Sequence, residues 1–211
     1  RDLGSAQLMA AIQDAQADFA EGDVGCGKGM VCHSLKGGVG SASRQVEIDG
    51  HTYTIGVLVQ SNHGSLKDLI IAGKPAGRII DAALNCSAPD KGSIISVMAT
   101  DIPLSSRQIG RVIRRASVGL ARLGSFIGHG SGEVMLGFTT ANRVPHAPEK
   151  GVMDFRAVSE NRIDSLFRAM AEAEEEAVLN SMVTARTVTG YDGTVKRSLN
   201  EFMDAILAWR E

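Results

Sequence analysis

The spacing of apolar residues along the chain predicts four helices. In each of them apolar positions recur every three or four residues, the spacing that puts them on one face of a helix. In the first, Leu8, Met9, Ile12 and Phe19 follow Ser5, a residue type that often caps a helix N-terminus. The predicted helices cover residues 5–20, 105–123, 160–184 and 198–209.

Between these helices lie segments whose composition predicts strands. Residues 93–99 and 133–141 are apolar, and the first is rich in β-branched residues, as in buried strands. Residues 46–60 predict a hairpin, because Asp49-Gly50 is a strong two-residue turn signal. Residues 72–92 mix Gly, Pro, Ser, Asn and Lys and predict an exposed segment. Since helices and strands alternate in blocks, the chain is predicted to be a layered α/β protein.

Composition narrows the class of protein. The chain has 211 residues, a net charge of -2 and 44% hydrophobic residues, which suits one domain with a sizeable core. The balanced charge gives no support for a nucleic-acid partner, and the basic residues 107, 111, 114 and 115 fit a solvated helix face or a subunit contact. No apolar run approaches the roughly 20 residues that cross a membrane, so no membrane association is expected.

Cysteine usage bears on compartment and metal binding. Cys26, Cys32 and Cys86 form no even disulfide framework, which favours a reducing, cytoplasmic location. The periplasm is the alternative, because the chain opens on Arg1 without a methionine. Cys26, Cys32 and His33 are possible metal ligands, but a tetrahedral site needs four and no second cluster has metal-ligand spacing. Buried thiols without a metal are therefore expected.

Glycine is unusually frequent. The 24 glycines concentrate in residues 22–40 and 119–137, where the backbone is expected to turn tightly or approach a ligand. Gly25-Cys26-Gly27-Lys28-Gly29 lacks the spacing of a phosphate-binding loop. It is expected to be a tight loop near a site.

Two short stretches carry candidate chemistry. Ser131 and Glu133 lie two residues apart at the start of a predicted strand, so their side chains should point to the same side. Gly92-Ser93 joins an exposed segment to a buried strand, and glycine permits unusual dihedral angles before the serine. Attack of Ser93 on the Gly92 carbonyl, followed by hydrolysis, would free an α-amine on Ser93. With a pKa of about 7.7–8.0, this amine can serve as a base beside its own hydroxyl.

Taken together, the motifs resemble the DmpA-like family of L-aminopeptidase/D-alanine esterase-amidases and β-peptidyl aminopeptidases. Order and spacing agree across nearly the whole chain. The matching stretches are residues 21–25, 29–40, 56–64, 92–95, 99–101, 119–122, 130–133 and 139–142.

The resemblance implies a fold and a site. The expected fold is a four-layer αββα sandwich similar to N-terminal-nucleophile hydrolases, in a precursor that cuts itself between Gly92 and Ser93. Ser93 matches the nucleophile, Ser131 and Glu133 match its partners, and Asn62 matches the oxyanion-site asparagine. The family's α part is longer than residues 1–92, and its upstream active-site tyrosine has no counterpart here. We expect residues 1–92 to be the end of an α part and 93–211 an entire β part, together one domain.

The function expected from this resemblance is a self-processing serine aminopeptidase or amidase. It would act on small peptides, amides or esters without metal or organic cofactor, as a homotetramer of αβ units. An ornithine acetyltransferase or an amide-oligomer hydrolase of the same superfold is the first alternative, although both families use threonine where this chain has Ser93. A non-catalytic binding or assembly protein is the second.

Overall fold

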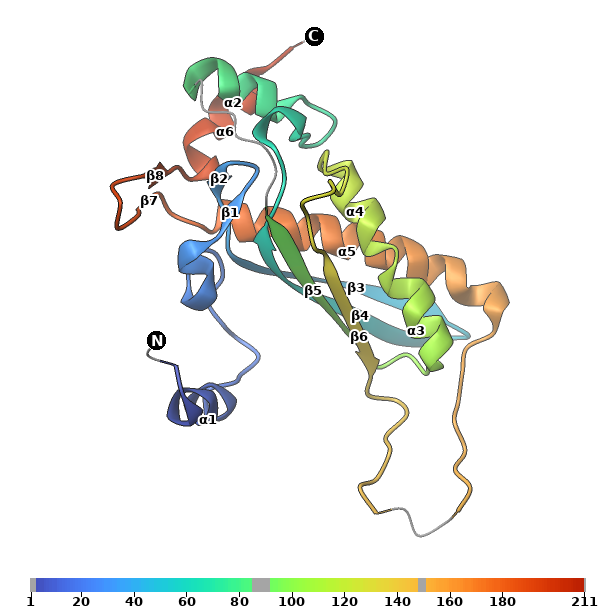
Figure 1. Cartoon of the computed structure of the whole chain (residues 1–211). Coiled ribbons are helices and arrows are strands. Elements are labelled where there is room, and N and C mark those ends of the chain that lie inside the picture. The colour runs from blue at the N-terminus through green and yellow to red at the C-terminus, as the bar shows by residue number, and fades with distance from the viewer. Residues whose placement is uncertain (1–2, 85–91, 148–150, 211) are drawn as a thin grey trace.

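A four-stranded sheet forms the centre of the molecule (Figure 1). The computed structural model describes residues 3–84, 92–147 and 151–210. The strands lie in chain order: β3 (Val39–Ile48), β4 (His51–Asn62), β5 (Ser93–Thr100) and β6 (Val134–Thr139). Neighbouring strands are antiparallel except β5 and β6, which are parallel. The parallel pair brings the first residues of β5 and β6 to one edge of the sheet.

The hairpin that opens the sheet confirms the turn predicted at Asp49-Gly50. Both residues have positive φ, 50° and 78°, as a two-residue type I′ turn requires. The register pairs Ile48 with His51 and continues without interruption to Val39 opposite Gln60. The hairpin is therefore longer than the predicted 46–60 at both ends.

One helical layer covers one face of the sheet. The helix α5 (Ile163–Val183) packs on β3 and β4, and α4 (Ala116–Arg122) and α3 (Ser106–Ile113) pack against α5 (Figure 1). Alternate residues of β5 are buried beneath these helices, Ile94, Ser96, Met98 and Thr100. At Gly40 a side chain would lie only 2.1 Å from the carbonyl oxygen of Ala177, so glycine allows α5 to approach β3 closely.

Shorter elements surround this core. Figure 1 places α2 (Ala76–Leu84) and α6 (Met203–Ala208) beside each other near the C-terminus. Two small hairpins pair β1 (Val31–Cys32) with β2 (Leu35–Lys36), and β7 (Val188–Thr189) with β8 (Val195–Lys196). The remaining elements are α1 (Ser5–Gln13), η1 (Gly25–Gly29), η2 (Leu66–Asp68), η3 (Glu160–Arg162) and η4 (Leu199–Phe202).

Three further predicted elements differ from the structure. The first helix ends at Gln13 instead of residue 20, and Gly4 rather than Ser5 occupies the N-cap position. The helix predicted over 105–123 is two helices, because the turn at Arg115 is closed by a three-residue hydrogen bond to Val112. The segment predicted to be exposed contains α2, which starts after Pro75; residues 85–91, including Cys86 and Lys91, lie outside the described part of the chain.

The other face of the sheet carries exposed apolar side chains. This open face comprises Leu58, Ile95, Val134, Leu136 and Phe138, which are 38–55% exposed. The described residues form one large sheet and one helical layer, two of the four layers expected from the sequence. Within the same residues, none of the helices combines the length and apolar character needed to span a membrane.

Candidate active site

The candidate nucleophile and the candidate oxyanion donor are direct neighbours across two strands. Ser93 is the first residue of β5 and pairs with Asn62, the last residue of β4. Residues directly opposite each other in an antiparallel pair have Cβ atoms about 4.5–5.5 Å apart on the same face. Ser93 alternates with the buried Ile94, so both side chains lie on the open face. The structure thus brings together two residues that are 31 positions apart in the sequence.

The side-chain amide of Asn62 is oriented by the backbone. The N–H of Val31 donates a hydrogen bond of 2.8 Å to Asn62 Oδ1. Because this bond occupies the acceptor end of the amide, it fixes which end is which. The Nδ2 group is then the end of the side chain that can donate to another oxygen.

The loop before β6 lies against Ser93. The backbone N–H of Gly132 donates to Ser93 Oγ at 3.1 Å, and the hydroxyl of Ser131 donates to the carboxylate of Glu133. The predicted proximity of Ser131 and Glu133 is therefore confirmed. The parallel pairing of β5 and β6 explains why the loop just before Val134 lies at the same end of the sheet as Ser93. The four residues predicted for the site, Asn62, Ser93, Ser131 and Glu133, gather at one edge of the sheet.

The backbone around Gly92 leaves no room for a side chain at this position. A Cβ atom built on Gly92 would lie 1.7 Å from the backbone oxygen of Asn62. Only glycine allows the chain before Ser93 to pass so close to the end of β4.

The glycine-rich loop is organised around a buried lysine. Lys36 is 1% exposed, and its Nζ donates to the carbonyl oxygens of Gly27, Met30 and Gly37 at 2.5, 2.6 and 2.7 Å. Burial lowers the pKa of Lys36. A loop that binds phosphate directs N–H groups at its ligand, whereas this loop directs carbonyl oxygens at an ammonium group. The prediction that it is a tight loop beside the site is confirmed, because Met30 precedes the residue that orients Asn62.

An ion pair fastens the same loop to the segment that follows α5. Asp23 is 2% exposed and accepts hydrogen bonds from the backbone and side chain of Arg186, and from Lys28. Bonding to Arg186 is the main reason that the pKa of Asp23 lies far below its usual range. Residues 22–29 are thereby held in place by Lys36 on one side and by Arg186 on the other.

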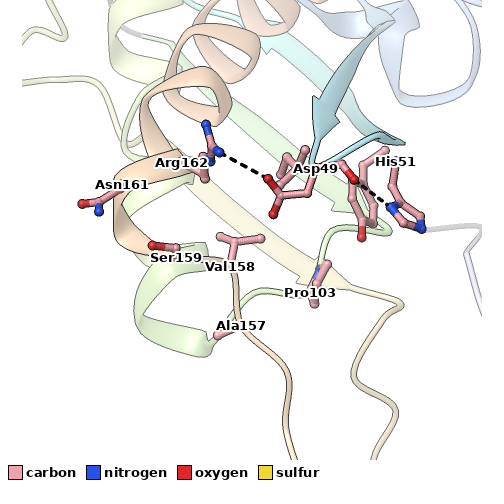
Figure 2. A pocket seen from close by; sticks show the side chains of 10 residues that line it. Asp49, His51, Pro103, Ala157, Val158, Ser159, Asn161 and Arg162 are labelled. Atoms are coloured by element: carbon pink, nitrogen blue, oxygen red, sulfur yellow. Dashed lines mark hydrogen bonds and ion pairs between the residues drawn. The ribbon is translucent and has the colours of Figure 1, made fainter.

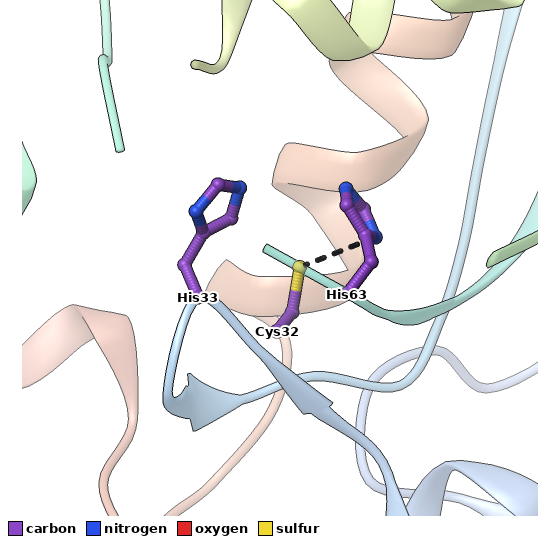
Figure 3. Close-up of side chains that lie close together, drawn as sticks. All are labelled: Cys32, His33 and His63. Carbon is purple, nitrogen blue, oxygen red and sulfur yellow. Dashed lines mark hydrogen bonds between the residues drawn. The ribbon is translucent and has the colours of Figure 1, made fainter. Parts of the chain in front are cut away.

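A second group of buried polar side chains lies directly behind Asn62. Cys32, His33 and His63 come together there (Figure 3). Cys26, by contrast, is exposed. Sequence reasoning missed His63, because its 31-residue separation from Cys32 carries no metal-ligand spacing. To find His63, one would have had to predict that β1 lies beside the end of β4.

A large cavity lies at the opposite end of the sheet. Its volume is about 680 Å³, and its lining includes Asp49, His51, Pro103 and Arg162, with Arg162 directed at Asp49 (Figure 2). His51 and Asn62 are the two ends of β4, about 37 Å apart in an extended strand. A smaller cavity of about 270 Å³, lined in part by Met30 and Val31, lies closer to Asn62.

The basic helix face predicted from residues 107–115 makes contacts inside the chain. Arg107 and Arg111 both pair with Glu160, and the guanidinium groups of Arg111 and Arg115 lie over the ring of Phe167. These contacts fasten α3 to the beginning of α5.

Comparison with known proteins places these features in a family. The chain is 40% identical to the β-peptidyl aminopeptidase BapA of Sphingosinicella microcystinivorans over 94% of its length, which is 54% of that protein. A second BapA, from Sphingosinicella xenopeptidilytica, is 38% identical over 87% of the chain. The chain spans about half the length of these curated relatives.

Solved structures support the same assignment. The L-aminopeptidase D-Ala-esterase/amidase of Ochrobactrum anthropi, described as a variant of the Ntn hydrolase fold, matches 98% of this chain and 57% of its own, with 35% identity and a TM-score of 0.87. A protein of Pyrococcus horikoshii matches 95% of this chain and 55% of its own, with 46% identity and a TM-score of 0.85. The predicted α/β class and its N-terminal-nucleophile hydrolase architecture are thus confirmed. Since the model of peptidase family S58 also matches residues 1–196, the chain belongs to that family.

Proposed function

We propose that the chain is the catalytic region of a self-processing serine aminopeptidase or amidase, with Ser93 as the nucleophile. One observation carries this proposal. The strand register sets Asn62 opposite Ser93, and the Gly132 N–H contacts the Ser93 hydroxyl oxygen. A nucleophile beside a donor that can stabilise the developing oxyanion is the arrangement that acyl transfer needs.

In the self-processing step, Ser93 Oγ attacks the carbonyl carbon of Gly92. The new C–O bond replaces the Gly92–Ser93 amide bond, and the released amine takes up the hydroxyl proton. Water then hydrolyses the ester, which leaves a carboxylate on Gly92, the hydroxyl of Ser93 and a free α-amine on Ser93. The packing of Gly92 against the backbone of Asn62 supports this step, since it holds the amide beside the residue that carries the proposed oxyanion donor.

In turnover, the α-amine of Ser93 accepts the proton of its own hydroxyl while Oγ attacks the substrate carbonyl. The amine has a pKa of about 7.7–8.0 in model compounds, close to neutrality. Asn62 Nδ2 donates to the oxyanion that develops on the substrate. The leaving amine takes the proton, and water hydrolyses the acyl-enzyme.

Ser131 and Glu133 supply the remaining roles. Their hydrogen bond holds the carboxylate at the edge of the site, where it orients the Ser93 amine through the serine hydroxyl. The carboxylate also pairs with the ammonium group of the substrate, which restricts cleavage to the residue at the N-terminus. Residue for residue, this agrees with the resemblance of Ser131 and Glu133 to the family's serine and glutamate.

The proposed substrates are short peptides, amides or esters with a free amino terminus. Two curated relatives are named β-peptidyl aminopeptidases, and a solved relative is named for L-amino and D-alanine substrates. Parallel assays with p-nitroanilides of a β-amino acid, an L-amino acid and D-alanine separate these preferences. Acetyl transfer from N-acetylornithine to glutamate, or cleavage of linear amide oligomers, would instead indicate the alternative enzymes.

Intact-mass analysis of the full-length protein tests the mechanism. The wild type is expected to yield two fragments with a new N-terminus at Ser93, whereas Ser93→Ala remains uncut and inactive. Ser43→Ala, which alters an exposed serine of β3, should be cut and active like the wild type. A single uncut species with full wild-type activity would overturn the proposal. Failure of correctly folded wild type to react with a serine-directed acylating probe would favour a non-catalytic protein.

The proposed assembly is a homotetramer of αβ units, which rests on the family resemblance. Native mass spectrometry of the processed protein should give four copies of each fragment in one particle. A predominant particle with any other stoichiometry would contradict this assembly.

A further inference from the structure

Three buried side chains from two segments converge behind Asn62. Cys32 and His33 follow one another at the end of β1, and His63 follows directly after β4 (Figure 3). One ligand-capable atom of each lies within 4.8 Å of the other two. The residues are 0–1% exposed, so the group belongs to the interior and not to a solvated surface.

The chemistry of His33 is fixed by its surroundings. Its Nδ1 lies 2.9 Å from the backbone oxygen of Ser65, which can only accept, so Nδ1 carries the proton and Nε2 the lone pair. A hydrogen bond of this kind from the second ring nitrogen is the usual support of a metal-binding histidine. The His33 ring packs against Gly64, where a side chain would not fit, because a Cβ there would lie 2.5–2.6 Å from three ring atoms.

His63 and Cys32 complete the group. The Nδ1 of His63 lies 3.9 Å from Cys32 Sγ, and the two imidazole rings meet edge to face with centroids 5.5 Å apart. Around Zn²⁺, Zn–S bonds of about 2.3 Å and Zn–N bonds of about 2.0–2.1 Å give N–N and N–S ligand separations of about 3.3–3.6 Å. Shifts of about 1 Å or less would therefore bring the three atoms to bonding distance.

We propose that Cys32, His33 and His63 form a binding site for one Zn²⁺ ion. One thiolate and two imidazoles are a donor set that suits zinc and does not suit Mg²⁺ or Ca²⁺, which prefer oxygen ligands. Three protein ligands leave a fourth position for water or another donor. The site is separate from the serine chemistry and does not depend on the proposed function.

The proposed site would join two segments that position the oxyanion donor. Cys32 follows Val31, whose N–H holds Asn62 Oδ1, and His63 follows Asn62 itself. A bound ion would thus tie β1 to the end of β4. Zinc is expected to stabilise the folded protein, because a ligand that binds only the folded state adds its binding free energy to stability.

Equilibrium binding to the full-length, chelator-treated protein tests the site. Zn²⁺, measured in competition with a chromophoric chelator, is expected to bind with one ion per chain and to raise the unfolding temperature. Cys32→Ser and His63→Gln should each weaken binding by at least about 100-fold, whereas Cys26→Ser and His51→Gln, which alter exposed residues, should bind like the wild type. Absence of Zn²⁺ binding, or equal binding by wild type and Cys32→Ser, would overturn the proposal.

A spectroscopic measurement keeps all three proposed ligands in place. In the double variant Cys26→Ser, Cys86→Ser, Cys32 is the only thiol of the chain. Co²⁺ bound to this protein should show a thiolate-to-metal charge-transfer band, and X-ray absorption of the Zn²⁺ form should show one sulfur neighbour. A coordination shell of nitrogen and oxygen only would contradict the assignment.

Discussion

At the scale of single residues, burial decides what a polar side chain does. Lys36 and Asp23 are buried with several partners each, and they hold the glycine-rich loop in place. Glu174 of α5 is also fully buried, but it has one hydrogen bond, donated by Ser96, and its Oε1 has no partner in the described structure. Burial therefore raises the pKa of Glu174 to about 7.

This shift predicts a pH-dependent stability. Between pH 4.5, the usual pKa of the group, and about 7, the folded state keeps a proton that the unfolded state releases. The free energy of unfolding should therefore fall as the pH rises through this window, by up to about 3 kcal/mol. In Glu174→Gln, urea unfolding at several pH values should lack this fall, and the variant should be more stable than wild type at pH 8. Exposed Glu47→Gln is the control; an unchanged pH profile in Glu174→Gln would contradict the prediction.

Asn62 allows a test of the oxyanion site at the same scale. Asn62→Ala is expected to lower kcat by about 10²–10³-fold with a small change in KM, because the donor acts on charge that develops in the transition state. Steady-state kinetics on processed enzyme give both constants. The exposed Gln45→Ala serves as control. A loss confined to KM would show that Asn62 binds the ground state instead.

At the scale of elements, the sequence predicted best the elements that a local turn signal or an apolar run defines. Asp49-Gly50 fixed the hairpin, and the apolar runs placed β5 and β6 to within about two residues. The helix α2 was missed, because its glycine and nearby loop residues dominate the composition. There Gly77 serves packing, since a Cβ would lie 1.6 Å from the backbone oxygen of Leu66.

Gly92 gives a prediction for the start of β5. In Gly92→Ala the added methyl group collides with the backbone of Asn62, so the end of β4 and the start of β5 are expected to separate and self-cleavage to slow by at least about tenfold. The cut fraction is followed over time by intact mass. Gly110→Ala is the matched control, because nothing lies within 4 Å of its added methyl group. Cleavage of Gly92→Ala at the wild-type rate would contradict this account.

At the scale of the whole molecule, the sequence indicated which residues belong to the candidate site better than it indicated how the fold brings them together. Ser131 and Glu133 are neighbours in the chain, so their contact followed from spacing. The pairing of Asn62 with Ser93 depends on a strand register that only the folded sheet sets. His63 joins Cys32 and His33 in the same way, because the fold brings together two strands that are far apart in the sequence.

The place of β5 inside the sheet has a consequence for how the protein can be made. A cut before Ser93 would leave β5 paired with β4 from Ser93 to Thr100, and α5 packed on β3 and β4. A cut in the backbone at this point would therefore leave the two polypeptides held together by strand pairing and packing. The two polypeptides should assemble into one particle when they are produced from separate genes, with Ser93 supplied as a ready-made N-terminus. Co-purification of an untagged partner with a tagged one would report this reconstitution, and independent elution of the two would refute it.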